Sequence, residues 1–356
     1  MRLLFAFAAA LPVASMLTTF IAARAEDAPR ISGPFTHQNL SVYFVHGVSA
    51  SGPVPLTLQE ALERNAVEVI ETGSVNELKI RNKGAEGIFI QSGDIVKGGQ
   101  QDRVVTTSFV LPPKSGDVPL ASFCVENGRW SARGKEAVSH FGSANESMPS
   151  RKAKLAMKAP LPAEPDAPVS KSTANRQARG GDDTGKRQQM VWNEVASTQD
   201  KLAGGLKAEV KAAESVSSLQ LTLENEKLQA ARADYIKALE AKGMSGDDIV
   251  GYVFAVNGHI NSADLYPSNA LFRKMWNKLL AASVTEAIGD STGVSTASPP
   301  DIAAVRQFLA NAEAGKPQEE TVANLAKQDV RDTPDALYVG VQSKKGEWVH
   351  RSYMKK

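Results

Sequence analysis

Apolar and polar residues alternate with a period of two along much of the first half of the chain, which is typical of half-buried β-strands. Gly, Asn and Pro separate these short runs, so crossover helices have no room between consecutive strands. Residues 56–64 alone in this half have helical spacing. We therefore predict a mainly antiparallel β core, either a sandwich or a partly closed barrel. The predicted strands cover residues 41–45, 67–71, 77–81, 87–91, 104–111 and 118–125.

Helical periods dominate the second half of the chain, and strands frame them. The Asn257-Gly258 pair between two apolar runs predicts a hairpin, because these residues adopt the tight turn that joins antiparallel strands. Since strands precede and follow the helices, we predict an α+β fold with an inserted helical section. The predicted helices cover residues 187–195, 216–241, 269–288 and 301–314, and the predicted strands cover 248–256, 259–266, 336–342 and 347–353.

Residues 142–186 differ in composition from the rest of the chain. Pro, Ala, Ser, Lys and Asp dominate there, aromatic residues are absent, and no period is sustained. Such a segment buries too little apolar surface to offset the entropy of ordering it, so we predict a disordered insertion. The predicted organisation is a leader at 1–25, a β-rich part at 26–141, the insertion at 142–186, and a helical section with closing strands at 187–356.

The N-terminus has the pattern of a secretory signal peptide. Arg2 precedes an apolar run that ends in Ala23-Arg24-Ala25, an A-x-A cleavage site. An uncleaved anchor is the alternative, because the run nearly reaches the ~20 residues of a membrane span. Pro12 and the small-residue site favour cleavage after Ala25. We expect a periplasmic or secreted protein with no membrane attachment after cleavage.

Charge and cysteine content narrow the classes of function. The leader removes two of the 41 basic residues, which leaves 39 against 39 acidic ones. A chain near neutrality lacks the field that steers proteins onto nucleic acid, so we predict no nucleic-acid partner. The single cysteine, Cys124, lies in an apolar run and is expected to be a buried hydrophobic residue. The five histidines show no metal-ligand spacing, so neither a metal site nor a cofactor is predicted.

The stretch Gly93–Arg103 has the densest combination of flexible backbone and hydrogen-bonding side chains in the sequence. Gly98 and Gly99 leave backbone N–H groups uncovered, and such groups form anion-binding nests. Gln100 supplies an amide, and Arg103 supplies a fork of N–H donors beside it. Arg129 and Trp130 follow an Asn-Gly turn; they are either a turn in which the arginine packs on the indole or the opposite wall of the site. A tight turn between strands is the structural alternative for the glycines.

Three aspartates are candidates for acid or base catalysis. Asp94 and Asp102 flank the glycine pair, and Asp264 follows the predicted hairpin. Paired carboxylates are the usual means of hydrolysing glycosidic bonds. Carboxylates in turns are also common for structural reasons, and the sequence does not give the distances between these three.

These motifs together resemble one family, the ARG and rhodanese-phosphatase-superfamily-associated protein domain family. The resemblance covers roughly residues 33–289, and its most specific part is the polar loop. Its name implies association with ADP-ribosylglycohydrolase-like and phosphatase-like proteins, hence ligands of the ADP-ribose or phosphate type. Gly98, Gly99, Gln100 and Arg103 match the family's polar motif. The matching segments are Gly93-Asp-x-x-x-Gly-Gly-Gln-x-x-Arg103, Arg129-Trp130, Val191-Trp192, Asn257-Gly258 and Asp264-Leu265-Tyr266.

Three functions follow from these observations. The preferred one is an exported protein that binds a small ligand at the loop. This ligand is anionic, for example phosphate-bearing, or carbohydrate-like. The second is a hydrolase of phosphoester or glycosidic bonds in which Asp94 or Asp102 is the acid or base and Arg103 stabilises developing charge. The third is an envelope scaffold with a protein partner. The binding hypothesis predicts that Arg103→Ala abolishes ligand stabilisation while the fold melts normally.

Overall fold

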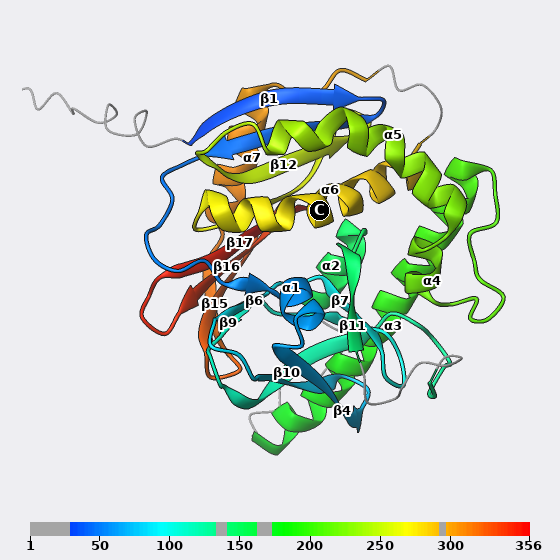
Figure 1. Cartoon of the computed structure of the whole chain (residues 1–356), viewed down its shortest axis with the longest axis vertical. Helices are drawn as coiled ribbons and strands as arrows, with labels where there is room; N and C mark the ends of the chain where they lie inside the picture. Colours follow the sequence, from blue (N-terminus) through cyan, green and yellow to red (C-terminus); the bar gives the residue numbers. More distant parts are fainter. Residues whose placement is uncertain (1–28, 133–140, 162–172, 292–296) are drawn as a thin grey trace, which may run out of the picture.

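We describe the fold from a computed structural model of residues 29–132, 141–161, 173–291 and 297–356. The predicted leader lies outside these ranges. Both ends of the described chain enter one antiparallel sheet of eight strands, in the order β1-β2-β12-β13-β17-β16-β15-β14 (Figure 1). Its strands are β1 Arg30–His37, β2 Leu40–His46, β12 Ile249–Val256, β13 His259–Leu265, β14 Pro317–Val322, β15 Ala326–Asp332, β16 Ala336–Ser343 and β17 Trp348–Lys355.

The segment between β2 and β12 forms the smaller sheets. Six strands follow the order β11-β7-β8-β10-β5-β4 and three more follow β3-β6-β9. Among the strands of the described ranges, β3 and β6 alone pair in parallel. The six-stranded sheet curls so far that its edge strands β11 and β4 approach each other. Its strands are β4 Val67–Ser74, β5 Glu77–Asn82, β7 Asp94–Gly98, β8 Arg103–Val105, β10 Gly116–Cys124 and β11 Phe141–Ser147, and the third sheet holds β3 Leu56–Thr57, β6 Ile88–Ile90 and β9 Phe109–Leu111.

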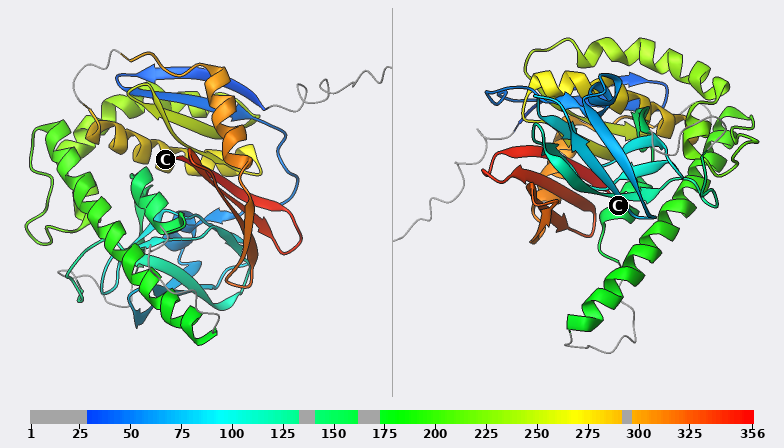
Figure 2. Two further views of the ribbon diagram at one scale, coloured as in Figure 1. Left: turned by 180° about the vertical axis from the view of Figure 1, so that it is seen from behind. Right: turned by 60° about the horizontal axis from the view of Figure 1, so that its bottom comes forward.

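Helix α6 lies between the two halves of the molecule. It packs on β12 and β2 of the large sheet and on β11 of the curled sheet, so its apolar residues join one core shared by both (Figure 1). Helix α7 covers the other face of the large sheet (Figure 2). Its Phe308 and Leu309 belong to one apolar cluster with Tyr43 and Tyr353 of the sheet. The helices are α1 Leu58–Glu63, α2 Arg151–Lys158, α3 Thr173–Leu206, α4 Leu219–Leu223, α5 Glu226–Gly243, α6 Asn269–Gly289 and α7 Ile302–Glu313.

The α+β class and the mainly antiparallel, partly closed β core are confirmed. The predicted hairpin at Asn257-Gly258 is also present, with φ angles of 51° and 78° at the two turn residues. The stripe predicted for α6 is buried, with Leu271, Phe272 and Met275 at most 2 % exposed. Within the described ranges, no helix combines the length and the apolar character that crossing a membrane requires.

Other predictions differ from the structure. The predicted insertion at 142–186 includes most of β11 and all of α2, while residues 162–172 lie outside the described part. Small residues such as Ala144 and Ala153 pack in the core, and the buried Glu146 pairs with Arg232. The composition of the segment predicted disorder because the contacts that order it are made with segments distant in sequence. The predicted strand 104–111 is divided between β8 and β9, the helix 216–241 is divided between α4 and α5, and β14 and β15 were not predicted.

Candidate functional site

The glycine pair connects β7 to β8, in a loop that turns back beside its own sheet. Gly98 and Gly99 have φ angles of +124° and +60°, which L side chains rarely adopt. A Cβ at Gly99 would come within 2.2 Å of the Phe141 ring and 2.9 Å of the Glu71 carboxylate. Glycine is therefore required at this position both for the backbone angle and for space.

Arg103 is held below the surface of this loop. Its side chain is 0 % exposed, one Nη donates to the carbonyl oxygen of Gln101 at 2.7 Å, and the other lies 3.7 Å from the Glu71 carboxylate. Nε and Nη2 have no hydrogen-bond partner among the described residues. A buried guanidinium with spare donors is costly, because each unpaired N–H has lost its water. Arg103 thus retains unused hydrogen-bonding capacity.

Arg129 and Trp130 do come to the loop, as the sequence predicted. The Trp130 ring centroid lies 5.4 Å from the Arg103 guanidinium carbon, which is cation–π distance, and Trp130 is 43 % exposed. Arg129 donates from Nε to Glu126 at 2.6 Å, and its Nη2 lies 3.7 Å from Asp102. The indole therefore covers Arg103 and turns part of its surface to solvent.

Three carboxylates surround these two arginines. Asp102 accepts from the Gly98 N–H at 2.9 Å, and Glu71 accepts from the Gln100 N–H at 3.2 Å. Glu126 is 0 % exposed and also accepts from the Ser215 hydroxyl. Gln100 thus contributes its backbone to the loop's geometry, and its side chain is half-buried. We call this group the loop cluster: Glu71, Asp102, Arg103, Glu126, Arg129 and Trp130.

Glu71 and Glu126 were not predicted. Glu71 lies in β4, 32 positions before Arg103, and no local motif points to it. Glu126 had a weak signal, because it stands three residues before Arg129 at the end of an apolar run. Strand pairing brings both glutamates to the loop, and that pairing is not visible in a single sequence.

Cys124 borders the loop cluster and is 0 % exposed, as predicted. Burial raises the pKa of its thiol to about 11, and the neighbouring Arg103 offsets only part of that effect. The group therefore stays a thiol at neutral pH and lacks the thiolate that a nucleophile needs.

Asp94 and Asp264 lie in a different place, at the seam between the curled sheet, the large sheet and α6. Asp94 is 2.7 Å from the ammonium group of Lys278 on α6. Asp264 on β13 is 3.1 Å from Nε2 of His350 on β17, whose Nδ1 is 3.1 Å from the Ser108 hydroxyl. We call these five residues the seam cluster: Asp94, Ser108, Asp264, Lys278 and His350. Each is at most 6 % exposed.

Ser108, His350 and Asp264 are arranged in space as in a catalytic triad, but the serine is not accessible to a substrate. The Ser108 oxygen also accepts from the Ser92 N–H at 2.9 Å. Its hydroxyl lies 3.1 Å from His350 Nδ1, and Nε2 of the same ring faces Asp264. Ser108 is 2 % exposed. A hydroxyl fixed by two partners and closed to solvent stabilises the fold and is not available as a nucleophile.

The Asp264 carboxyl keeps a low pKa although it is buried. Burial alone raises its pKa, but the His350 hydrogen bond and charge, with smaller effects of Lys154 and Ser352, outweigh burial and lower the pKa below its usual value. Asp264 is consequently ionised in the folded protein at neutral pH, although it is buried.

The three candidate aspartates do not form one acid/base pair. Asp94 begins β7, whereas Asp102 is bonded to the N–H of Gly98 at the other end of that strand. Four steps of roughly 3.3 Å place these two strand ends roughly 13 Å apart. Carboxylates that act on one glycosidic bond lie about 5–9.5 Å apart. The Asp94 and Asp102 arrangement therefore does not support a paired-carboxylate mechanism.

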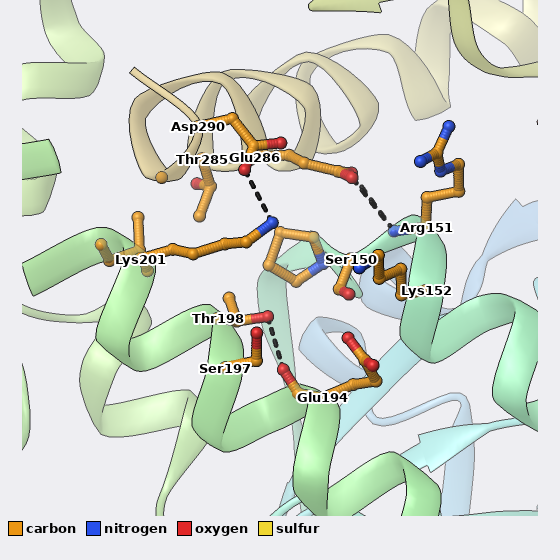
Figure 3. Close-up of a pocket in the computed structure, with 13 residues that line it drawn as sticks. Ser150, Arg151, Lys152, Glu194, Ser197, Thr198, Lys201, Thr285, Glu286 and Asp290 are labelled. Carbon is orange, nitrogen blue, oxygen red and sulfur yellow. Dashed lines mark hydrogen bonds and ion pairs between the residues drawn. The ribbon is translucent and has the colours of Figure 1, made fainter. Parts of the chain in front are cut away.

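A separate pocket lies away from both clusters, between α2, α3 and α6 (Figure 3). Ser150 and Arg151 open α2 on one side, Thr198 and Lys201 come from α3, and Glu286 comes from α6. The sequence predicted no site here. Among the described residues, no three His, Cys, Asp or Glu side chains gather in a way that would hold a metal ion.

Comparison with known proteins gives one result. The model of a protein family described as "ARG and Rhodanese-Phosphatase-superfamily-associated Protein domain" matches residues 28–354. No curated protein matches the chain, and no solved structure matches it either.

Proposed function

The chain belongs to the ARG and Rhodanese-Phosphatase-superfamily-associated Protein domain family, and we propose that this member is an exported protein that binds a small ligand at the loop cluster. The ligand class that we propose is a carbohydrate-like or ADP-ribose-like molecule. Such a ligand would lie on the exposed part of Trp130 and exchange hydrogen bonds with the polar groups of the loop around it. The family description names associated proteins and assigns no reaction to this chain.

The observation that carries this proposal is the Trp130 indole resting on Arg103. An exposed indole fixed from below by a buried guanidinium is a rigid apolar platform, and sugar rings and nucleobases stack on such platforms. Arg103 cannot rotate away easily, because Gln101 and Glu71 hold two of its nitrogens. The half-buried Gln100 lies beside the platform, where its backbone carbonyl accepts from the Ser131 N–H, and its side-chain amide can exchange hydrogen bonds with hydroxyl groups.

Charge favours the polyol part of the ligand over a bare phosphate. Among the described residues, three carboxylates of the loop cluster face two guanidinium groups. An approaching phosphate meets both signs of charge here, and Arg129 is already paired with Glu126. Hydroxyl groups do not depend on an unpaired cation, since each can both donate and accept a hydrogen bond.

The test compares two tryptophans that both stack on an arginine. We expect ADP-ribose or an oligosaccharide to raise the melting temperature of the mature chain, because a ligand that binds only the native state stabilises it. Trp130→Ala is expected to weaken that binding about 5- to 150-fold, the loss of about 1–3 kcal/mol found when a stacking side chain is removed. The measurement is titration calorimetry with each ligand that shifts the melting temperature.

Trp348→Ala is the matched control. Trp348 lies 4.9 Å from Arg351 in the same kind of stack, on β17 in the large sheet. We expect this variant to bind the ligand as the wild type does. Equal losses in both variants, or unchanged binding by Trp130→Ala, would refute the proposed site. Ribose 5-phosphate and inorganic phosphate in the same panel separate recognition of the ring from recognition of the phosphate.

Arg103→Ala is a poor test of this site, contrary to the expectation from the sequence. Arg103 is fully buried beside Glu71, so its removal leaves a carboxylate without its partner and destabilises the fold. The predicted normal melting of that variant does not fit this burial.

The two other candidate functions have no observation in their favour. The hydrolase hypothesis makes Asp94 or Asp102 the acid or base beside Arg103. Asp94 is paired with Lys278 in the seam cluster, and Asp102, although it lies in the loop cluster, is 0 % exposed and accepts from the Gly98 N–H. The scaffold hypothesis needs a partner surface, and nothing in the described part of the chain indicates its occupant.

Export is part of the proposal and rests on the N-terminal sequence pattern. Cleavage after Ala25 leaves Glu26 as the first residue of the mature protein. N-terminal sequencing of protein recovered from the periplasm or medium tests this, and recovery of the chain with its leader in the membrane fraction would contradict it.

A further inference from the structure

Lys158 is the last residue of α2 and lies where that helix meets α3 and the large sheet. Helix α2 packs against α3 and against β17. Leu155 and the C-cap residue Ala159 lie against an apolar cluster of the sheet, which fixes the end of the helix there. Lys158 itself is half-buried, so solvent reaches part of its side chain.

The hydrogen bonding of Lys158 differs from that of Lys278, the buried lysine of the seam cluster. The Lys158 ammonium group donates to the side-chain oxygen of Gln328 at 2.8 Å, and within the described ranges it takes part in no ion pair. Gln328 is 1 % exposed and donates in turn to Glu320 at 3.2 Å. Lys278, by contrast, lies 2.7 Å from the Asp94 carboxylate. A neutral amide compensates an ammonium group for its lost water much less than a carboxylate does.

The charged form of Lys158 is correspondingly disfavoured. Burial and the positive charge of Arg187 lower the pKa of the Lys158 amine to about 8, and the negative charge of Glu320 opposes only part of this effect. At pH 7 about one such amine in ten is neutral, against about one in 2,500 for an ordinary lysine with a pKa of about 10.4. The neutral amine is the nucleophilic form of a lysine.

Arg187 of α3 is fixed beside this amine by the end of α2. Its Nη1 donates to the carbonyl oxygens of Ala156 at 3.0 Å and Ala159 at 2.8 Å. Carbonyl groups at the end of a helix have no partner within the helix, so this guanidinium caps α2. Asp183 and Glu320 act on Arg187 from a distance, and it forms no ion pair with either in the described part of the chain. The cap therefore holds a positive charge close to the amine.

We propose that Lys158 is a covalent binding site for a small aldehyde or ketone, which its amine captures as an imine. The amine attacks the carbonyl carbon, and one proton passes from the nitrogen to the carbonyl oxygen. The second proton of the nitrogen leaves with that oxygen as water while a C=N bond forms, so no oxidant or reductant takes part. The side-chain oxygen of Gln328 accepts from the imine nitrogen when that nitrogen is protonated. This inference does not depend on ligand binding at the loop cluster.

Acetaldehyde is the probe, and cyanoborohydride reduces the imine to an ethyl amine that peptide mass spectrometry assigns to a residue. At pH 7 we expect trapping at Lys158 to be roughly tenfold or more faster than at Lys152, an exposed lysine of the same helix. The rate at Lys158 should reach half its limit near pH 8, where half of its amine is neutral. The α-amino group of the chain, with an ordinary pKa of about 7.7–8.0, is the internal positive reference.

Two charge variants with opposite expected signs separate this site from non-specific labelling. Glu320→Gln removes the negative charge that opposes deprotonation, so trapping at Lys158 should become about two- to fivefold faster, the size of one partly screened charge interaction. Arg187→Gln should slow it by a similar factor, and Arg187→Lys, which keeps the charge, should restore it. Glu319→Gln is the matched control, because Glu319 adjoins Glu320 in β14 but points to the opposite face of the strand, and it is expected to change nothing.

Each remaining outcome decides the question. Trapping at Lys158 that is no faster than at Lys152 overturns the proposal, as do equal rates in the Glu320→Gln and Glu319→Gln variants. Glu320 is exposed, so its variant keeps the test valid even if Arg187→Gln fails to fold. Trp130→Ala should leave the trapping rate unchanged, which separates this site from the one at the loop cluster.

Discussion

The loop cluster and the seam cluster contain similar charged groups but differ in ion pairing and in exposure to solvent. Both bury carboxylates next to cations, and both were candidates from the sequence because they contain Asp94, Asp102, Arg103 and Asp264. In the seam cluster every charged group lies against a partner, and each residue is at most 6 % exposed. In the loop cluster Arg103 keeps spare donors, and Trp130 above it is 43 % exposed.

This difference separates groups that stabilise the fold from groups that we propose bind a ligand. A buried charge without a partner is destabilising, so closed ion pairs such as those of the seam cluster are what folding alone would select. An exposed indole over an incompletely bonded guanidinium stabilises the fold little and leaves an apolar surface in contact with solvent. The chemical type of a residue therefore does not distinguish the two clusters, whereas its access to solvent does.

The largest expected effect tests whether the seam cluster is structural. Lys278→Met leaves Asp94 buried without its cation, and breaking a buried ion pair in this way costs about 3–5 kcal/mol. The free energy of unfolding, measured by urea denaturation, is expected to fall by that amount.

Lys274→Met is the matched control on the same helix. Lys274 lies 2.9 Å from Glu60, but both side chains are 28 % exposed. Such pairs contribute about 0–1 kcal/mol. A similar small loss of unfolding free energy in both variants would show that the Asp94–Lys278 pair contributes no more than a surface pair. The seam cluster would then not be the stabilising one of the two clusters.

A smaller effect is expected in the loop that carries the loop cluster. Gly99→Ala forces an L residue to a φ of +60° and places its Cβ on Phe141. Left-handed strain of about 1–2 kcal/mol and overpacking of about 1–3 kcal/mol together predict a loss of roughly 2–5 kcal/mol, measured by urea denaturation.

Gly128→Ala isolates the strain from the clash. Gly128 has a φ of +86°, and no atom lies within 4 Å of the position its Cβ would take. We expect the smaller loss here, due to the backbone alone. If Gly99→Ala costs no more than Gly128→Ala, the packing of the loop against Phe141 is not what fixes the cluster.

The smallest effect has a pH dependence that only the seam cluster should show. Asp264→Asn removes a charged hydrogen-bond acceptor for His350, which predicts a loss of about 1.5–3 kcal/mol at pH 7. Because the folded state lowers the pKa of Asp264, this stabilisation is complete above the usual value of about 4. It disappears as the pH falls through the lowered folded-state pKa. The difference between variant and wild type, measured in urea at pH 7, 5 and 3, should shrink toward acid.

Asp234→Asn is the exposed counterpart. The hydrogen bond from His37 lowers the pKa of Asp234 as well, but the Asp234 side chain is 63 % exposed. Solvent screens such a pair, so we expect a smaller change in stability than for Asp264→Asn. A difference for Asp264→Asn that does not vary with pH would show that its ionisation has no part in the stability of the seam.

Several parts of the structure follow from short stretches of sequence. The Asn257-Gly258 turn and the buried stripe of α6 were predicted because their signals lie within a few residues. The convergence of Arg129 and Trp130 on Arg103 was also predicted, although only as a hypothesis about the loop. Glu71 and Glu126 were missed, because they reach the loop through the pairing of strands that are distant in sequence. Most of β11, all of α2 and the start of α3 were predicted to be disordered, since the segment has no aromatic residue and the buried Glu146 in β11 pairs with the distant Arg232.

The sequence alone determined the α+β class, the turns and the residue types at the polar loop, because these depend on periods and conformational preferences over a few residues. It also gave the leader pattern on which the proposal of export rests. Only the tertiary structure decided that Asp94 and Asp264 are closed inside a seam, that Arg103 lies beneath an exposed indole, and that Lys158 donates to Gln328. Burial and ion pairing arise between segments far apart in the chain, so they exist only once the sheets and α6 have packed.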